Sequence, residues 1–265
     1  MKQLRQYSLQ SGFSLIELAI VLFIVTLLLG GLLVPLSAQI DQQRAKETQK
    51  TLADLKDALI GFAIVNGRLP CPATATSNGV ENFCTLTTGI AGCPTTTVIQ
   101  PHGNCSNYND GFVPAASLGM TPVDANGYLL DGWNNRIRYA VSNPTLGTYT
   151  HALTAASGIK NATISTLSGA NLLYACASAT GITGANCGTA TKLTDSAAAL
   201  VFSLGKNGST TGSGTDEAAN LNNDVIFVSH SQTATGSTNG EFDDMLTWLP
   251  SAILIGRMVT AGQLP

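Results

Sequence analysis

The strongest constraint on the fold is an uncharged run close to the amino terminus. Residues 18–36 form a stretch of nineteen residues without a charged side chain. As a helix, this stretch is long enough to cross most of a hydrocarbon layer about 30 Å thick. The polar residues ahead of it include Lys2 and Arg5. Because positive charge favours the cytoplasmic side, we expect a single membrane span with the carboxyl-terminal part of the chain across the membrane.

Glu17 stands at the start of this apolar run. A carboxylate within a span costs about 3 kcal/mol on insertion scales, and such acids usually serve a function with a specific partner. Cleavage between Gly12 and Phe13 would create an α-amino group about one helical turn from Glu17, in the same chain or in a neighbouring one. An ordinary secretory signal, cut so that the mature chain begins at Gln39, is the alternative, and it gives Glu17 no role.

Residues 12–17 have the sequence Gly-Phe-Ser-Leu-Ile-Glu, which resembles the prepilin leader motif of type IV pilins and type II secretion pseudopilins. The resemblance implies cleavage after Gly12 by a prepilin peptidase, N-methylation of Phe13, and use of Glu17 to set the register between subunits. It also implies two further partners, namely other pilins or pseudopilins in a filament and an inner-membrane assembly platform. Pro35 lies one residue further from the cleavage point than the usual kink-forming proline of the family.

The rest of the chain predicts an α+β domain. Residues 37–66 indicate an amphipathic helix, with Leu52, Leu55, Leu59 and Phe62 spaced by three and four residues. Apolar runs separated by turn-rich segments then predict an antiparallel sheet, followed by a short helix from Pro250 to Met258. The expected strands are residues 136–141, 172–176, 198–204, 225–229 and 245–248.

We therefore expect a pilin-like fold in which a long N-terminal helix, membrane-spanning in its first half and amphipathic in its second, packs on an antiparallel sheet. Four segments follow from this reading. They are a leader peptide (1–12), a transmembrane or filament-core helix (13–36), an amphipathic helix that continues into the globular domain (37–66) and a periplasmic pilin-like globular domain (67–265).

The six cysteines contain no Cys-x-x-Cys pair and no Cys/His spacing of the zinc type. Disulfides, and hence an oxidising compartment such as the bacterial periplasm, are the expected use. We expect Cys176 to pair with Cys187, and two pairs, whose connectivity is left open, to form within the first group. That group contains Cys71, Cys84, Cys93 and Cys105.

Two interior segments also resemble pseudopilins. Residues 131–139 are similar to the family element D-P-W-G-N-P-x-x-Y, with Gly132 in place of proline, and we interpret them as structural. Residues 202–226 are similar to the family's calcium loop, which implies calcium ligands at Asn207, Asp216 and Asp224. A solvated polar loop without a metal is the alternative, and no other cofactor is expected.

The charge of the chain and the motifs that it lacks argue against several functions. The formal charge is −3 and no Lys/Arg cluster is present, so no nucleic-acid partner is expected. The chain lacks G-x-S-x-G, H-E-x-x-H and Walker motifs. The three histidines stand alone, and the adjacent Asp243 and Asp244 should point in different directions in an extended strand. The histidines are His102, His151 and His230.

We therefore expect a structural subunit of a type IV pilus or a type II secretion pseudopilus, and no enzyme. It would be stored in the bacterial inner membrane as a single-pass protein and then assembled into the filament. The 199 residues from position 67 onward exceed the compact domain of a typical major pseudopilin, which favours a minor subunit. A major pilin, an adhesive tip subunit and a membrane-anchored periplasmic enzyme are the alternatives.

Overall fold

The computed structural model describes residues 12, 14–84, 93, 102–146, 150–161, 172–184, 186–208 and 214–264, and for residues 29–36 the backbone only. The chain divides into two compact units, Met1–Gln43 and Arg44–Pro265. Helix α1, Leu15–Asn66, supplies residues to both units. The helical segments predicted for residues 13–36 and 37–66 are thus one continuous helix from Leu15 onward, and Phe13 lies outside the described residues.

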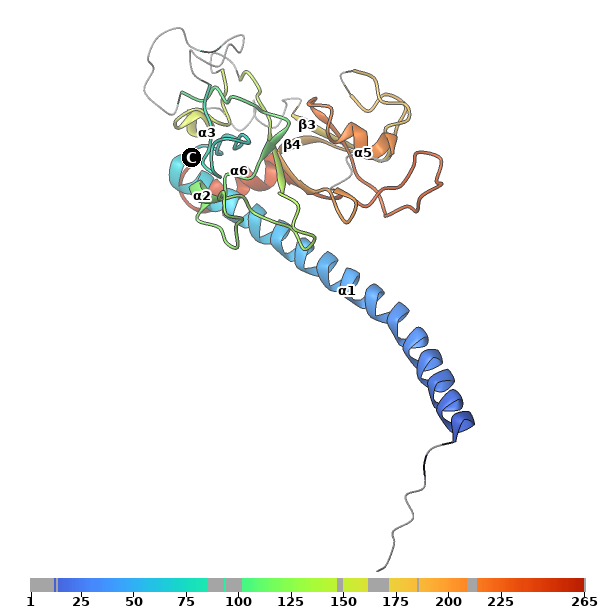
Figure 1. Ribbon diagram of the computed structural model, residues 1–265. Coiled ribbons are helices and arrows are strands. Elements are labelled where there is room, and N and C mark those ends of the chain that lie inside the picture. The colour runs from blue at the N-terminus through green and yellow to red at the C-terminus, as the bar shows by residue number, and fades with distance from the viewer. Residues whose placement is uncertain are drawn as a thin grey trace, which may run out of the picture. The chain divides into compact units, whose positions relative to one another are not determined.

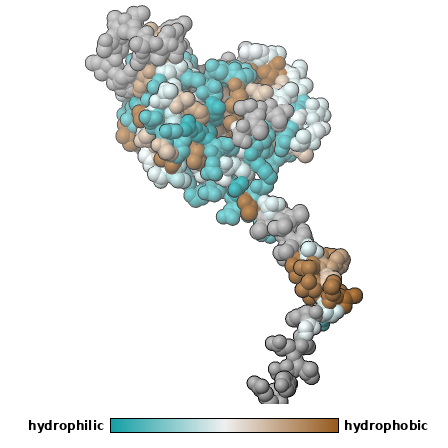
Figure 2. Space-filling model, in the orientation of Figure 1, coloured by the Kyte–Doolittle hydropathy of each residue, from teal (hydrophilic) through white to brown (hydrophobic). Residues whose placement is uncertain are grey.

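Between Leu15 and Leu28, exposed apolar side chains lie on all sides of α1. The large apolar residues between Leu15 and Leu28 are all exposed, with 87% of Leu15 and 67% of Phe23 accessible, and Figure 2 shows them gathered on the described first part of this helix. The hydroxyl of Thr26 donates back to the carbonyl oxygens of Leu22 and Phe23 at 3.0 and 2.9 Å. This segment therefore presents an almost wholly apolar surface.

Among the described residues, no helix has the combined length and apolarity that a membrane span requires. The predicted span includes residues 29–36, whose side chains lie outside the described part of the chain. The membrane span therefore stays a prediction.

The second unit contains a six-stranded mixed sheet (Figure 1). Its path runs β1-β2-β4-β3-β5, and β6 pairs with β4. The strands are β1 (Gly111–Phe112), β2 (Arg138–Val141), β3 (Leu173–Cys176), β4 (Lys192–Ser203), β5 (Ile226–Val228) and β6 (Met245–Pro250). The short helices are α2 (Ala115–Leu118), α3 (Gly158–Asn161) and α5 (Thr215–Ala219), and α6 (Ser251–Thr260) closes the chain.

The sheet departs from the predicted antiparallel arrangement at one pair of strands. β3 and β5 are parallel, with Ala175 opposite Phe227, whereas the other pairings are antiparallel. A parallel pair needs a long connection. Here β4 and α5 lie between the two strands along the chain, a length that allows the chain to return in the same direction.

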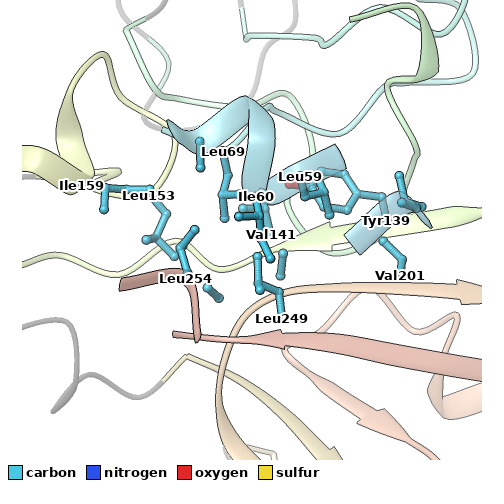
Figure 3. Close-up of a cluster of buried hydrophobic side chains, with 14 of the residues drawn as sticks. Leu59, Ile60, Leu69, Tyr139, Val141, Leu153, Ile159, Val201, Leu249 and Leu254 are labelled. Carbon is cyan, nitrogen blue, oxygen red and sulfur yellow. The ribbon is translucent and has the colours of Figure 1, made fainter. Parts of the chain in front are cut away.

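The main core lies between the second half of α1, the sheet and α6. Leu55 and Leu59 are buried as predicted, and Figure 3 shows Leu59 and Ile60 close to Val141 of β2 and Leu249 of β6. On β4, Ala199 and Val201 belong to this core while Leu200 and Phe202 belong to a second cluster. Because side chains alternate along a strand, β4 is buried on both faces.

Three disulfides fasten the second unit. They join Cys71 to Cys105, Cys84 to Cys93, and Cys176 to Cys187. The structure therefore links the cysteines within the two groups that their spacing suggested. The first bridge holds the chain just beyond α1 to the segment ahead of β1.

Candidate functional site

The amino-terminal site is built at the first turn of α1. Ser14 immediately precedes the helix, and its backbone N–H donates to Oε2 of Glu17 at 3.2 Å. Ser14 and Glu17 stand at the positions of a capping box, in which an acid three residues into the helix satisfies a free N–H group at its start. Within one chain, Glu17 thus stabilises the helix terminus and also places a carboxylate among exposed apolar side chains.

Nothing in the described part of the chain requires a glycine at position 12. It is exposed, its φ is not in the left-handed range, and a Cβ built on it would meet no atom within 4 Å. An alanine would therefore fit here without strain, and packing within the subunit does not explain the glycine. Phe13, the predicted site of methylation, lies outside the described residues.

The three predicted calcium ligands make hydrogen bonds to different partners. Asp216 accepts from Ala179 N at 2.6 Å and lies 3.1 Å from His230 Nε2. Asp224 accepts from Ile226 N at 2.7 Å and from the amide of the nearby Asn222. Asn207 instead donates through Nδ2 to Glu217 at 2.9 Å. Through this hydrogen bond, Asn207 contacts a different acid from the two that the loop resemblance implied.

A cluster of three acids lies beside Asn207. Glu217 of α5 and Asp243 and Asp244, which precede β6, are buried and bring carboxylate oxygens within 4.8 Å of one another. The expectation that Asp243 and Asp244 point apart is therefore wrong. The alternation on which it rested applies to a strand, and β6 begins only at Met245. We call Glu217, Asp243 and Asp244 the acid cluster.

Neutral groups hold the acid cluster in place. Oδ2 of Asp243 accepts from the backbone N–H groups of Lys206 and Asn207 at 2.9 and 3.1 Å. Asp243 in turn donates its own N–H to Oε1 of Glu217 at 3.1 Å. Asn220 donates to Oδ2 of Asp244 at 2.7 Å. The donors to the three carboxylates thus come from the turn after β4, from Asn220 at the end of α5 and from the segment before β6.

Burial and mutual repulsion alter the acidity of the cluster. Burial raises the pKa of Asp243 to about 6, and the nearby charge of Glu217 adds to this rise. Burial also raises the pKa of Asp244 to about 7, with further contributions from Glu217 and Asp243. Removal from water and like-charge contact both disfavour the ionised forms. A bound cation would reverse this effect, because it would favour the charged carboxylates.

Asp244 also lines a groove with a volume of about 510 Å³. One wall is α1 between Ala45 and Lys56, and the other comprises residues 229–232 and the first residues of β6. The acid cluster is therefore buried by the surrounding chain but borders an open groove on one side. Sequence reasoning missed this cluster, since its only local signal was the pair of adjacent aspartates.

The comparison with known families agrees with the resemblance of the amino-terminal sequence to prepilins. Residues 7–33 match the family described as the prokaryotic N-terminal methylation motif, which is the signature of type IV pilins and pseudopilins. The match includes Gly12, Phe13 and Glu17. Neither the curated proteins nor the solved structures gave a match to the chain.

Proposed function

We propose that this chain is a minor structural subunit of a type IV pilus or a type II secretion pseudopilus. A prepilin peptidase would cleave it between Gly12 and Phe13, and the new amine of Phe13 would be methylated. The chain would wait in the bacterial inner membrane, with its second unit in the periplasm, until an assembly platform moves it into the filament. The motif at residues 7–33 supports a pilin-like or pseudopilin subunit, and the remaining steps belong to the proposal.

The observation that carries the proposal is the apolar surface of α1 between Leu15 and Leu28. A helix that is apolar on every side is stable only where lipid or other apolar helices cover it. Removal from the bilayer therefore requires a second apolar environment of similar extent. A filament built from copies of such helices provides one, and Glu17 would then pair with the amine of its own chain or of a neighbouring subunit.

Substitution of Glu17 tests the proposed assembly role. Glu17→Gln keeps an acceptor for the Ser14 N–H but removes the charge, whereas Glu17→Lys removes the acceptor and reverses the charge. Because the proposal assigns assembly to the charge, both variants should enter the membrane and both should be absent from purified filaments. Glu47→Gln, at an exposed acid further along α1, should be incorporated like the unmodified chain. Immunoblots of membrane and filament fractions measure the result.

Normal incorporation of Glu17→Gln would reduce Glu17 to a helix-capping residue and contradict the assembly role. Copy number in filaments would separate a minor subunit from a major pilin. Binding of purified protein to a receptor would favour an adhesive tip subunit. Activity of the purified chain would favour the membrane-anchored enzyme.

A further inference from the structure

We infer that the outer edge of β6 is a docking site for an extended segment of another polypeptide, which would add a strand to the sheet. Such a site goes beyond the proposed role in a filament and needs no processing at Gly12. Three features of the second unit support it. They are an unpaired strand edge, a groove along that edge, and an edge sequence without the residues that usually prevent pairing.

The outer side of β6 has no strand beside it in the described part of the chain. The N–H of Ser142 donates to the carbonyl oxygen of Ala198 at 3.0 Å, so even-numbered residues in this part of β4 bond toward β2 and odd-numbered ones toward β6. Odd-numbered residues of β6 lie opposite the odd-numbered residues 199–203 of β4. The main-chain N–H and C=O groups of Leu246 and Trp248 therefore face outward, where no described residue bonds to them.

A groove runs along this outer side. The cavity of about 510 Å³ that Asp244 lines shares four lining residues with a second cavity of about 660 Å³, so the two adjoin. The shared residues are Ala53, Lys56, Leu246 and Thr247. We call the joined space the edge groove. Leu246 and Thr247 are neighbours on a strand, so their side chains point to opposite faces of the sheet. A space that both residues line therefore lies along the edge of β6.

The sequence of β6 leaves this edge open to pairing. Folded proteins usually protect an exposed edge strand with devices such as charged side chains or proline. Residues 245–249 read Met-Leu-Thr-Trp-Leu, with no charge and no proline, and Pro250 stands only at the end of the strand. Residues 245–248 are all partly exposed. An uncharged, mostly apolar edge of this kind is a template for pairing with another chain.

The groups in the edge groove indicate what fits there. Outward main-chain groups at every second residue match those of another extended chain, whereas the main-chain groups of a helix bond internally. On the α1 side, Ala53 is small and leaves room. Lys56 and Arg257 also line the groove, and no described residue forms an ion pair with either. Asp57 offsets only one of these charges. The groove therefore fits an extended segment that carries an acidic residue.

Peptide selection on the full purified chain in detergent tests the site. The probe is a phage-displayed library of short random peptides, and fluorescence polarisation measures the affinity of each selected peptide. Ala53→Trp would fill part of the edge groove and should weaken binding at least ~10-fold, because the new side chain clashes with the peptide. Lys56→Glu should weaken the binding of acidic peptides ~3-fold or more.

Ala252→Trp is the matched control, since Ala252 is exposed on α6 and does not line the edge groove. It should bind the peptides like the unmodified chain. Ala53 is exposed as well, so both tryptophan variants should melt at the temperature of the unmodified chain. Equal binding by Ala53→Trp and the unmodified chain, or failure to select any peptide, would overturn the docking site.

Hydrogen exchange resolved to single residues separates strand addition from other modes of binding. With a selected peptide bound, the amides of Leu246 and Trp248 should exchange at least ~10-fold more slowly, because both would donate to the peptide. The amide of Thr247 faces β4 and should change less. Unchanged exchange at Leu246 and Trp248 would contradict strand addition. None of these results would affect the proposed filament role, which the Glu17 variants test.

Discussion

At the scale of single residues, Gly132 explains a departure from the pseudopilin pattern. A Cβ at this position would lie 2.5 Å from the carbonyl oxygen of Arg44 in α1. The N–H of Gly132 donates to the hydroxyl of Thr48 at 2.9 Å, and proline could not make this bond. The turn therefore approaches α1 closely enough to exclude a side chain.

Substitution of Gly132 by alanine should destabilise the second unit by about 1–3 kcal/mol, because the added methyl group overlaps the helix backbone. The free energy of unfolding in urea, followed by tryptophan fluorescence, measures the change. Gly256→Ala is the control. Gly256 lies in α6 with no atom within 4 Å of a built Cβ, so alanine should be neutral there or should stabilise by up to about 1 kcal/mol. Equal effects at the two positions would contradict the close approach.

At the scale of elements, local sequence patterns predicted where helices and strands lie better than they predicted which strands pair. The predicted stripe gave the buried side of α1, with Leu52, Leu55 and Leu59 buried and Phe62 partly buried. The helix ends at Asn66, the predicted last residue. β4 was expected from residue 198 but begins at Lys192. Its first residues are mostly polar and are exposed or partly exposed, and they form a strand by pairing with β3. Such pairing depends on tertiary structure and leaves little signal in the sequence.

The disulfides should contribute unequally to stability. The bridge between Cys71 and Cys105 spans 34 residues and that between Cys176 and Cys187 spans 11. In the chain-entropy model, their loss should cost about 4 and about 3 kcal/mol, respectively. Paired alanine variants compare them fairly, since all four cysteines are buried. Urea unfolding should rank the Cys71/Cys105 variant as the less stable. The reverse order would show that native contacts, rather than loop length, determine the difference.

At the scale of the whole molecule, the amino-terminal motif and the acid cluster differ in how far they could be predicted from the sequence. The amino-terminal motif is contiguous, so Gly12, Phe13 and Glu17 could be proposed as site residues from their order alone. The acid cluster is not contiguous, because Glu217 lies 26 residues before Asp243. Only the packing of α5 against the segment before β6 brings these acids together. The resemblance to a calcium loop pointed to Asp216 and Asp224, whereas Asn207 contacts Glu217 instead.

The central claim is that the chain is processed as a prepilin, and the amino terminus of the protein extracted from membranes tests it most directly. Intact-mass measurement and amino-terminal sequencing should find a chain that begins at Phe13 with one added methyl group. A chain that begins at Met1, or at Gln39 after conventional signal cleavage, would contradict the account.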